Sequence, residues 1–466
     1  MSIAEAHDRP PSRPLLIPPT PARPPNAMST LRRVAAVRRS TFDGWGPLVY
    51  EKDIIKGTFL GRSNFILNAP DAIRHVLIDN YENYTRTPIG LRVLRPIIGS
   101  EGLFLSEGRP WKYQRRTLAP AFSPRAVSTL VPHMHTAITE AIDALGRDAG
   151  QPVDLREAMQ WLALDIAGRT MFSFSIDKYG PELRAFVIEY ARELAQPQPL
   201  DLLLPLSWPS PRDFKRRRFR KRWIAFVNHL IAERRAKPSD GAPRDLFNLM
   251  VTARDPETGA AFNEAQLADQ VATMIIAGHE TTATALFWTL YLLALDRPTQ
   301  DELAAEASSE IQRAGSPDAI EVERLKLTRS VLDEALRLYP PAFLIARSAA
   351  APDVIAGRDV KPKDIILISP WILHRHEKLW REPNAFDPYR FLTGPPPDRF
   401  AYLPFGAGPR VCIGAHFALV EATLALARLI QKFKVELRST EPVLPIGIVV
   451  TQPDHAPVFA LTRRDG

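Results

Sequence analysis

A run of 25 residues from Val271 to Leu295 constrains the fold of this chain more than any other feature. It is almost wholly apolar, and His279 and Glu280 are its only residues that carry or can take a charge near neutral pH. Its length would suffice to cross a membrane. A charged pair near the middle, with Thr281 beside it, is expensive in hydrocarbon and indicates a helix buried in protein around a polar site. We therefore expect a large protein built around this helix.

The ends of the long helix are also marked in the sequence. Asn263 is a suitable N-cap residue, and Gln266 stands three positions later, which is the spacing of a capping box. Pro298, just beyond Asp296 and Arg297, indicates where the helix ends. These signals predict one helix over residues 264–295.

Most of the remaining chain also has the pattern of helices, because apolar residues recur at spacings of three and four. Short strands followed by a helix are predicted between Pro47 and Leu77. The other predicted helices are 111–122, 125–146, 154–173, 181–195, 212–236, 299–313, 328–338 and 416–433. Strand-like alternation occurs at 354–355, 365–368, 446–451 and 458–462. The fold class is therefore mainly α with minor β, a single large helical domain with a small β-rich region.

Composition supports a simple domain organisation. Eight prolines lie between Pro10 and Pro25 without an apolar core, so residues 1–30 are expected to form a Pro-rich disordered tail that is neither a signal peptide nor a membrane anchor. No linker-like stretch follows, and residues 31–466 are interpreted as one domain. A hydrophobic content of 45% and a charged content of 24% are ordinary for a globular protein.

The cysteine count and the net charge narrow the function. Cys412 is the only cysteine, which excludes an internal disulfide and fits a reducing cytoplasm. The net charge of +8 is spread along the chain, as expected of a solvated surface. The basic run 215–222 could serve a nucleic-acid or membrane-surface binding protein. It has only Phe219 and Trp223 as nearby aromatics and no recognisable binding motif, so we expect no nucleic-acid partner.

The setting of Cys412 is more informative than its number. Residues Phe405–Gly414 have the spacing F-x-x-G-x-R-x-C-x-G, and an apolar helical stretch follows. The glycines permit a tight turn and a close approach of the backbone to a flat ligand. Arg410 and the positive end of the next helix would favour the thiolate form of Cys412. A thiolate held in this way suits the axial bond of a haem iron.

Small and polar residues interrupt the long helix at Ala277–Thr282. Glycine weakens a helix, and a threonine hydroxyl can turn onto the carbonyl one turn back and loosen the backbone. Such a groove can hold a small ligand and a water molecule, with proton donors beside it. By itself the pattern is more typical of a notch where two helices pack.

Glu334 and Arg337 have the spacing of an ion pair on one helical face. The pairs 189/192, 310/313 and 321/324 have the same spacing, and most such pairs are exposed and contribute little. Apolar neighbours and the Tyr339-Pro340-Pro341 stop indicate that the 334/337 pair is buried. Arg390 lies in an aromatic, proline-containing turn at 386–391.

Trp111 and Arg115 lie one helical turn apart on one face. An indole N–H and a guanidinium that point the same way suit a carboxylate such as a cofactor propionate. An ordinary amphipathic helix would show the same spacing.

In this order, the motifs resemble those of the cytochrome P-450 family over roughly residues 45–464. The resemblance implies haem b, with Cys412 as the proximal iron ligand. It further implies propionate contacts from Trp111, Arg115, Arg347 and Arg410, haem contacts from Phe405 and Ala277, and a buried cluster of Glu334, Arg337 and Arg390. Glu280 and Thr281 would be the acid–alcohol pair that delivers protons to the reacting oxygen.

The function implied is that of a haem-thiolate monooxygenase, which inserts one oxygen atom from O2 into an apolar small molecule. By the same resemblance the pocket draws on residues 84–104, Ala277, Thr281, 343–345 and 448–449. Their apolar character favours a fatty-acid, terpenoid or steroid-like substrate. The alternative is a non-catalytic haem protein, such as a gas sensor or carrier, which would not need the Glu280–Thr281 pair.

Electrons must come from a separate protein, because no flavin or iron–sulfur segment fits in the chain and one cysteine cannot hold a cluster. We expect a ferredoxin-type donor with its reductase, which Lys112, Arg115 and Arg116 could dock. Residues 202–223 could form a pocket lid that touches membrane, although a hydrophobic access loop followed by a solvated basic helix is favoured. A cytoplasmic protein without a transmembrane segment is predicted.

Overall fold

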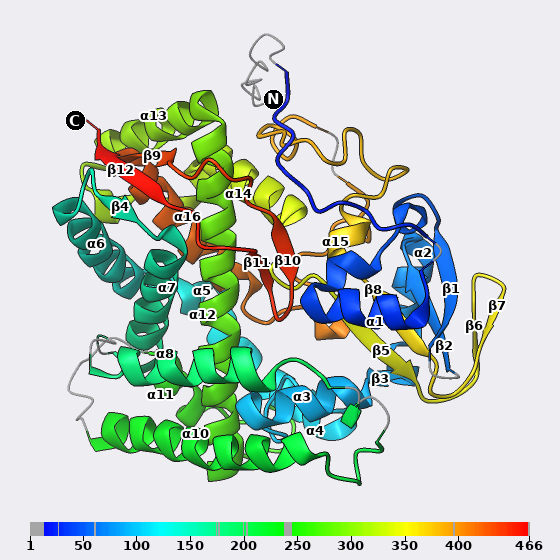
Figure 1. Cartoon of the computed structure of the whole chain (residues 1–466). Coiled ribbons are helices and arrows are strands. Elements are labelled where there is room, and N and C mark those ends of the chain that lie inside the picture. The colour runs from blue at the N-terminus through cyan, green and yellow to red at the C-terminus, as the bar shows by residue number, and fades with distance from the viewer. Residues whose placement is uncertain are drawn as a thin grey trace, which may run out of the picture.

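The computed structural model describes residues 14–26, 28–59, 62–173, 175, 178–198, 200–201, 204–236, 245–394 and 397–464. Helices make up most of it, and they surround the long helix α12 (Glu264–Leu295), which runs vertically through Figure 1. A smaller β-rich region lies to one side of these helices (Figure 1). The predicted fold class is confirmed.

Helix α12 is the centre of the hydrophobic core. It contacts α7 (Leu155–Phe172), α14 (Lys326–Leu338), α16 (Ala415–Lys432), α3 (Pro88–Ile98) and α10 (Pro211–Ala236). The predicted capping box is present, since the Gln266 N–H donates to Asn263 Oδ1 at 2.8 Å and the Asn263 N–H donates to Gln266 Oε1 at 3.1 Å. Within the described residues, no helix combines the length and the hydropathy that crossing a membrane requires.

The remaining helices mostly match their predicted spans. They are α1 (Thr30–Arg39), α2 (Pro70–Arg74), α4 (Gly108–Leu118), α5 (Pro124–Ser128), α6 (Val131–Arg147), α8 (Gly180–Glu189), α11 (Leu246–Thr252), α13 (Arg297–Ala314) and α15 (Pro370–Leu373). The single helix predicted over 125–146 was wrong. The chain breaks at Thr129 and Leu130, because Pro132 has no N–H to continue a helix and instead occupies the first turn of α6. Helices α1, α3, α11 and α15 were not predicted.

The main sheet joins two distant parts of the sequence. Its strand order is β1 (Ile54–Phe59), β2 (Arg62–Leu67), β8 (Ile365–Ile368), β5 (Ile345–Ala349) and β3 (Tyr84–Arg86). Only the β2–β8 pair in this sheet is parallel. The β3–β5 register places Arg86 directly opposite Arg347.

Three smaller sheets complete the β structure. They are β4 (Pro152–Val153) with β12 (Phe459–Arg463) and β9 (Phe433–Leu437), β10 (Pro445–Gly447) with β11 (Thr451–Pro453), and β6 (Asp353–Ile355) with β7 (Arg358–Val360).

The N-terminal segment 14–26, here called the strap, lies against the rest of the protein. The Phe386 N–H donates to the Leu16 carbonyl at 2.8 Å. Arg23 lies 4.1 Å from the centre of the Tyr50 ring and 3.3 Å from the Glu377 carboxylate. Residues 1–13 of the tail that we expected lie outside the described residues, and the domain boundary at residue 30 stays a prediction.

Helix α14 carries Glu334 and Arg337, which form a buried cluster with Arg390 from the turn at 386–391. Two nitrogens of Arg337 each donate to a Glu334 oxygen at 2.7 Å, and Arg390 Nε lies 3.0 Å from the same carboxylate. The other Arg337 N–H groups donate to the carbonyls of His374, Pro383 and Ala385. All five N–H groups of Arg337 therefore have acceptors, which is how a fully buried guanidinium is stabilised.

The other three pairs with the same spacing, 189/192, 310/313 and 321/324, differ from the Glu334–Arg337 pair, as expected. The Arg313 side chain, which pairs with Glu310, is 38% exposed. Arg324 reaches Glu310 rather than Glu321, and Glu189 pairs with Arg222.

Candidate active site

The cysteine loop comprises residues Phe405–Gly414, which directly precede α16. The Cys412 N–H donates to the Phe405 carbonyl at 2.9 Å, which closes the loop. Gly408 has a φ of +72°, and a Cβ there would lie 2.0 Å from the Leu77 carbonyl oxygen. Gly408 thus permits a close approach between two stretches of protein backbone, whereas a Cβ at Gly406 or Gly414 would meet no atom closer than 3.8 Å, so the predicted approach of these two glycines to a flat ligand stays a prediction.

Cys412 is exposed on one side, yet the protein around it raises the pKa of the thiol. Burial is the main cause, and the Gly414 N–H and the Arg115 charge act in the opposite direction. Arg115 is held beside the cysteine because its Nη1 donates to the Val411 carbonyl at 2.9 Å. The cation that favours the thiolate is therefore Arg115, from α4, and not Arg410 as the sequence interpretation had it.

Arg410 instead binds the start of α4. Its guanidinium lies 4.3 Å from the centre of the buried Trp111 ring, donates to the Ser106 carbonyl at 2.8 Å and forms an ion pair with Glu107. The spacing of Trp111 and Arg115 thus brings one side chain against Arg410 and the other against the Val411 carbonyl, next to Cys412.

A second group of cations lies next to Arg410. Arg347 and Arg86 face each other across β5 and β3. Burial and the charge of Arg410 together, opposed by Glu107, lower the pKa of Arg347 to about 10 and, with Arg347 itself, that of Arg86 to about 9. Like charges directly opposite each other destabilise a sheet, so this arrangement needs negative partners.

The sequence analysis missed Arg86. It is half-buried, its guanidinium lies 4.2 Å from the centre of the Phe104 ring, and its buried Nε has no hydrogen-bond acceptor among the described residues. Only the β3–β5 register shows that it faces Arg347, and a strand of three residues carries no periodicity from which a register can be read.

The three guanidiniums fit the two propionates of a haem. Among the described residues, Glu107 is the carboxylate that interacts with Arg86, Arg347 and Arg410. Three positive charges and one negative charge give this cluster a net charge of +2. Two carboxylates would balance this excess and supply an acceptor for Arg86 Nε. The donors present therefore match the charge of the group that the cysteine loop would hold.

The middle of α12 is the second part of the candidate site. Ala277 is exposed and Thr281 is half-buried in a helix that is otherwise mostly buried. A Cβ added to Gly278 would meet no atom within 4 Å. The Thr281 hydroxyl donates to the Ala277 carbonyl at 2.6 Å, as the sequence predicted for a threonine at this position. This face can accommodate a ligand.

Glu280 lies on another face of α12. Both of its carboxylate oxygens accept hydrogen bonds at 3.2 Å from Gln160 of α7, and Arg156 lies 3.9 Å away. The described contacts do not bring its carboxylate to the Thr281 hydroxyl. No sequence signal pointed to Gln160, because the contact joins two helices 120 residues apart.

A sequence model described as "Cytochrome P450" matches residues 52–457. This chain belongs to the cytochrome P-450 family. It is 33% identical to cyclooctatin synthase of Streptomyces melanosporofaciens over 78% of this chain and 79% of that protein. It is 30% identical to cyclooctat-9-en-7-ol 5-monooxygenase of the same organism over 91% of both. The solved haem domain of cytochrome P450DA superposes with a TM-score of 0.76 at 27% identity, over 89% of each chain.

The chain is thus a cytochrome P-450 oxidoreductase, and its family implies haem.

The first part of the region 202–223, which could form a pocket lid, is held by hydrogen bonds. Arg92 of α3 donates to the carbonyls of Asp201, Leu204, Pro205 and Trp208, at 2.6–3.0 Å. Residues 202 and 203 lie outside the described residues.

The basic run 215–222, which follows this loop in the sequence, is only partly exposed to solvent. Arg216 is buried against Asp201 and Asp213, and Arg220 pairs with Asp269. Trp208 and Phe214 are more than 60% exposed.

Two of the three cations expected to dock an electron donor already have acidic partners, while Arg115 donates to the Val411 carbonyl. Lys112 lies 2.7 Å from Glu82, and Arg116 lies 3.1 Å from Asp255 and 2.9 Å from Glu257. The Lys112–Glu82 pair is exposed and contributes little stability, so a partner's carboxylate could displace it, whereas Asp255 is buried and holds Arg116 with two hydrogen bonds.

Proposed function

We propose that this cytochrome P-450 is a haem-thiolate monooxygenase that inserts one oxygen atom from O2 into an apolar small molecule. Haem b would be held through Cys412, and electrons would come from a separate ferredoxin-type donor with its reductase. The observation that carries the proposal is the only cysteine of the chain on a loop beside Arg115, next to half-buried cations with two unbalanced positive charges.

Each side chain then has a defined task. Trp111, Arg86, Arg347 and Arg410 hold the propionates, and Phe405 and Ala277 contact the haem from the cysteine loop and from α12. Arg115 offsets the negative charge of the thiolate. The haem, when bound, supplies the oxidation chemistry, and the protein supplies position, charge and proton control.

Glu280 and Thr281 would control protons at the α12 face. Thr281 presents its hydroxyl oxygen beside the open space at Gly278. Glu280 is held by Gln160 and must leave it, or act through a water molecule, to pass a proton to Thr281. Gln160 would therefore set how readily protons reach the site.

The substrate would be apolar and weakly functionalised. The expected pocket segments contribute Leu91, Leu94 and Leu344, which are partly buried and pack against the core. One relative is named for a reaction on cyclooctat-9-en-7-ol, which by its name carries one double bond and one hydroxyl. A terpenoid-like substrate fits both. The lone cysteine supports a reducing compartment, and we propose a cytoplasmic location.

The proposal is tested by the absorption spectrum of the reduced protein with carbon monoxide. A thiolate ligand gives a strongly red-shifted Soret band, which Cys412→Ser should abolish, because the chain has no other cysteine. Wild-type protein should also oxidise reduced pyridine nucleotide when a ferredoxin, its reductase and an apolar substrate are added. Retention of the band in Cys412→Ser would exclude the ligand, and a normal band without any turnover would favour a sensor or carrier.

A matched pair of variants tests the proton path. Thr281→Ala should keep the carbon-monoxide band but yield more hydrogen peroxide and less product per nucleotide oxidised. Thr284 is a suitable control because its hydroxyl also donates to a carbonyl one turn back, that of Glu280, at 2.7 Å. Thr284→Ala should keep normal coupling. Equal coupling in both variants would remove the role from Thr281.

A further inference from the structure

Arg375, just after α15, is a buried cation without a partner. Its side chain is less than 2% exposed, and none of its guanidinium nitrogens has a hydrogen-bond acceptor among the described residues. It lies 3.6 Å from the centre of the Trp371 ring. An aromatic face stabilises a cation but cannot accept its five N–H groups in line. Arg337, by contrast, has an acceptor for every N–H.

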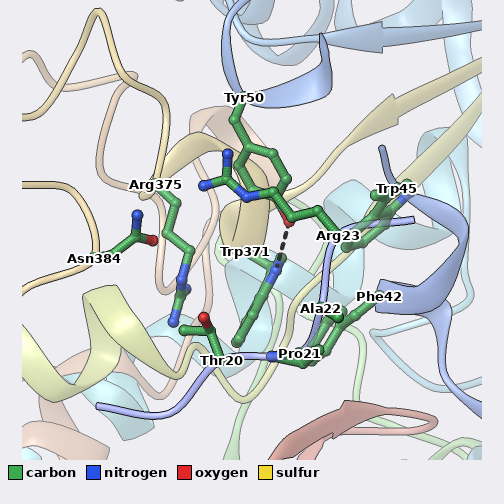
Figure 2. A pocket seen from close by; sticks show the side chains of 10 residues that line it. All are labelled: Thr20, Pro21, Ala22, Arg23, Phe42, Trp45, Tyr50, Trp371, Arg375 and Asn384. Carbon is green, nitrogen blue, oxygen red and sulfur yellow. Dashed lines mark hydrogen bonds between the residues drawn. The ribbon is translucent and has the colours of Figure 1, made fainter. Parts of the chain in front are cut away.

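Arg375 lines a small cavity between α15 and the strap. Figure 2 shows its guanidinium end beside Thr20, with Asn384 on one side and the Trp371 ring on the other. The volume is about 20 Å³ on the scale where one water molecule needs about 10–15 Å³. The cavity has room for one small ion.

The charged groups around this cavity are cations, and several of its polar groups can donate. Arg23 and Arg375 both line it, and no lining residue carries a carboxylate. The Tyr50 hydroxyl accepts a hydrogen bond from Trp371 Nε1 at 3.1 Å, so its own O–H is free to donate inward. Burial raises the pKa of Tyr50, which keeps this hydroxyl protonated. The Asn384 amide provides a further N–H group.

Water alone would leave the charge of Arg375 unbalanced. Burial, together with the neighbouring cations Arg337 and Arg23 and against the opposing effect of Tyr339 and Tyr50, lowers the pKa of Arg375 to about 9. Near neutral pH the guanidinium is therefore still charged, in surroundings where an unpaired charge is costly. An anion supplies both the acceptor and the charge, while water supplies only the acceptor.

We propose that this cavity binds one small monovalent inorganic anion, with Arg375 as the main ligand and Tyr50 and Asn384 as additional donors. Thr20 and Arg23 of the strap form one wall, so the anion would fasten the N-terminal segment to α15. The site is independent of the haem and of the proposed reaction, since neither Cys412 nor α12 contributes to it.

The test is thermal unfolding of the holoprotein in increasing chloride, with gluconate added to keep the ionic strength constant. The midpoint should rise and then saturate, because the anion binds the folded state alone. Arg375→Met should lose this response and, without chloride, should unfold at the same temperature as wild type or above it, since the substitution removes an unpaired buried charge. Arg358→Met, on the exposed strand β7, is the control and should respond like wild type.

Two further measurements keep the test decisive. Tyr50→Phe should shift the half-saturating chloride concentration upward several-fold, which remains measurable if Arg375→Met does not fold. Crystals grown in bromide should show an anomalous peak beside Arg375. An equal response of wild type and Tyr50→Phe, a peak only at molar bromide, water at this position, or a carboxylate of the chain against Arg375 would each overturn the proposal.

Discussion

Two arginine clusters in this protein differ in how their N–H groups are satisfied. In the Glu334 cluster, every N–H of Arg337 ends on an oxygen of the protein. In the Arg86–Arg347–Arg410 cluster, cations face each other across a sheet and share Glu107, and Arg86 Nε has no acceptor among the described residues.

The difference separates scaffold from binding site. A buried charge that the protein satisfies by itself holds the fold together, whereas one left in excess indicates that a ligand supplies the balance. Both clusters contain arginines beside aromatic rings, and the contrast becomes visible only when each N–H is followed to its acceptor.

The largest effect is expected where the satisfied cluster is broken. Arg337→Ala leaves the Glu334 carboxylate buried with Arg390 as its remaining cation, and should lower the free energy of unfolding by about 3–5 kcal/mol. Arg313→Ala breaks an exposed pair with Glu310 and should change it by about 0–1 kcal/mol. Urea unfolding of the two holoproteins measures the difference. Similar losses in both variants would show that full satisfaction of a buried cluster carries no special weight.

In the Arg86–Arg347–Arg410 cluster, a smaller effect is expected, on haem retention rather than on the stability of the fold. Arg347→Met would remove the proposed propionate contact and should weaken haem retention by about 1.5–3 kcal/mol, the usual contribution of a hydrogen bond to a charged group. The apoprotein should keep its stability or gain some, because one of two opposed charges is gone. Haem transfer to an acceptor protein and unfolding of the apoprotein measure the two quantities. A loss in both would place Arg347 with the scaffold arginines.

Asp201 forms a buried ion pair with Arg216, so the effect of a buried charge that the protein itself satisfies can be tested by changing the pH. Burial would raise its pKa, but Arg216, the Gln198 N–H and Ser210 outweigh this and lower it to about 2. Because the folded pKa lies below the unfolded value of 3.8, this stabilisation is present above about pH 5 and is lost as pH falls toward 2. It amounts to about 1–2 kcal/mol after allowance for screening. Asp201→Asn should show a smaller loss of stability between pH 5 and pH 3 than wild type, and equal slopes would refute the assignment.

The smallest effect is expected at a buried acid without a cation. Burial raises the pKa of Glu421 well above its usual value, and the Thr282 hydroxyl, 3.4 Å away, acts only weakly against this. Glu421 can become neutral by binding a proton, which an arginine cannot readily do. Glu421→Gln should therefore change stability by less than about 0.5 kcal/mol at low pH and should raise it as pH increases through the folded pKa. A large loss at every pH would mean that the carboxylate form is the one that the fold needs.

Much of the fold could be predicted from the sequence because the helices have strong local signals. The apolar run and the Asn263–Gln266 box located α12 to the residue. Helix α3 escaped because Pro96 lies inside it and is normally typical of a helix end. The β3–β5 pairing depends on register, which strands of three and five residues do not encode.

The site was predictable where it depends on one loop or one helical turn. Cys412, Arg410, Trp111 and Arg115 were found by spacing, and the structure brings them together. The roles of Arg115 and Arg410 toward the thiolate could not be assigned, because they depend on how α4 lies against the loop. Gln160 and Arg375 were missed for a similar reason, since each matters through contacts between distant segments.

The clamp at Arg92 has a consequence for how a molecule enters and leaves the protein. Arg92 holds four carbonyls of the 201–208 loop, and Trp223 Nε1 of α10 donates to the Ile97 carbonyl at 2.6 Å. Opening this loop alone would break four charge-assisted hydrogen bonds at once. Helix α3 and the described residues of this loop should therefore move together rather than separately. The rate of that motion would depend on the contacts that join α3 to α10 and α12, such as Trp223 Nε1 to the Ile97 carbonyl and the Thr273 hydroxyl to the Ile98 carbonyl.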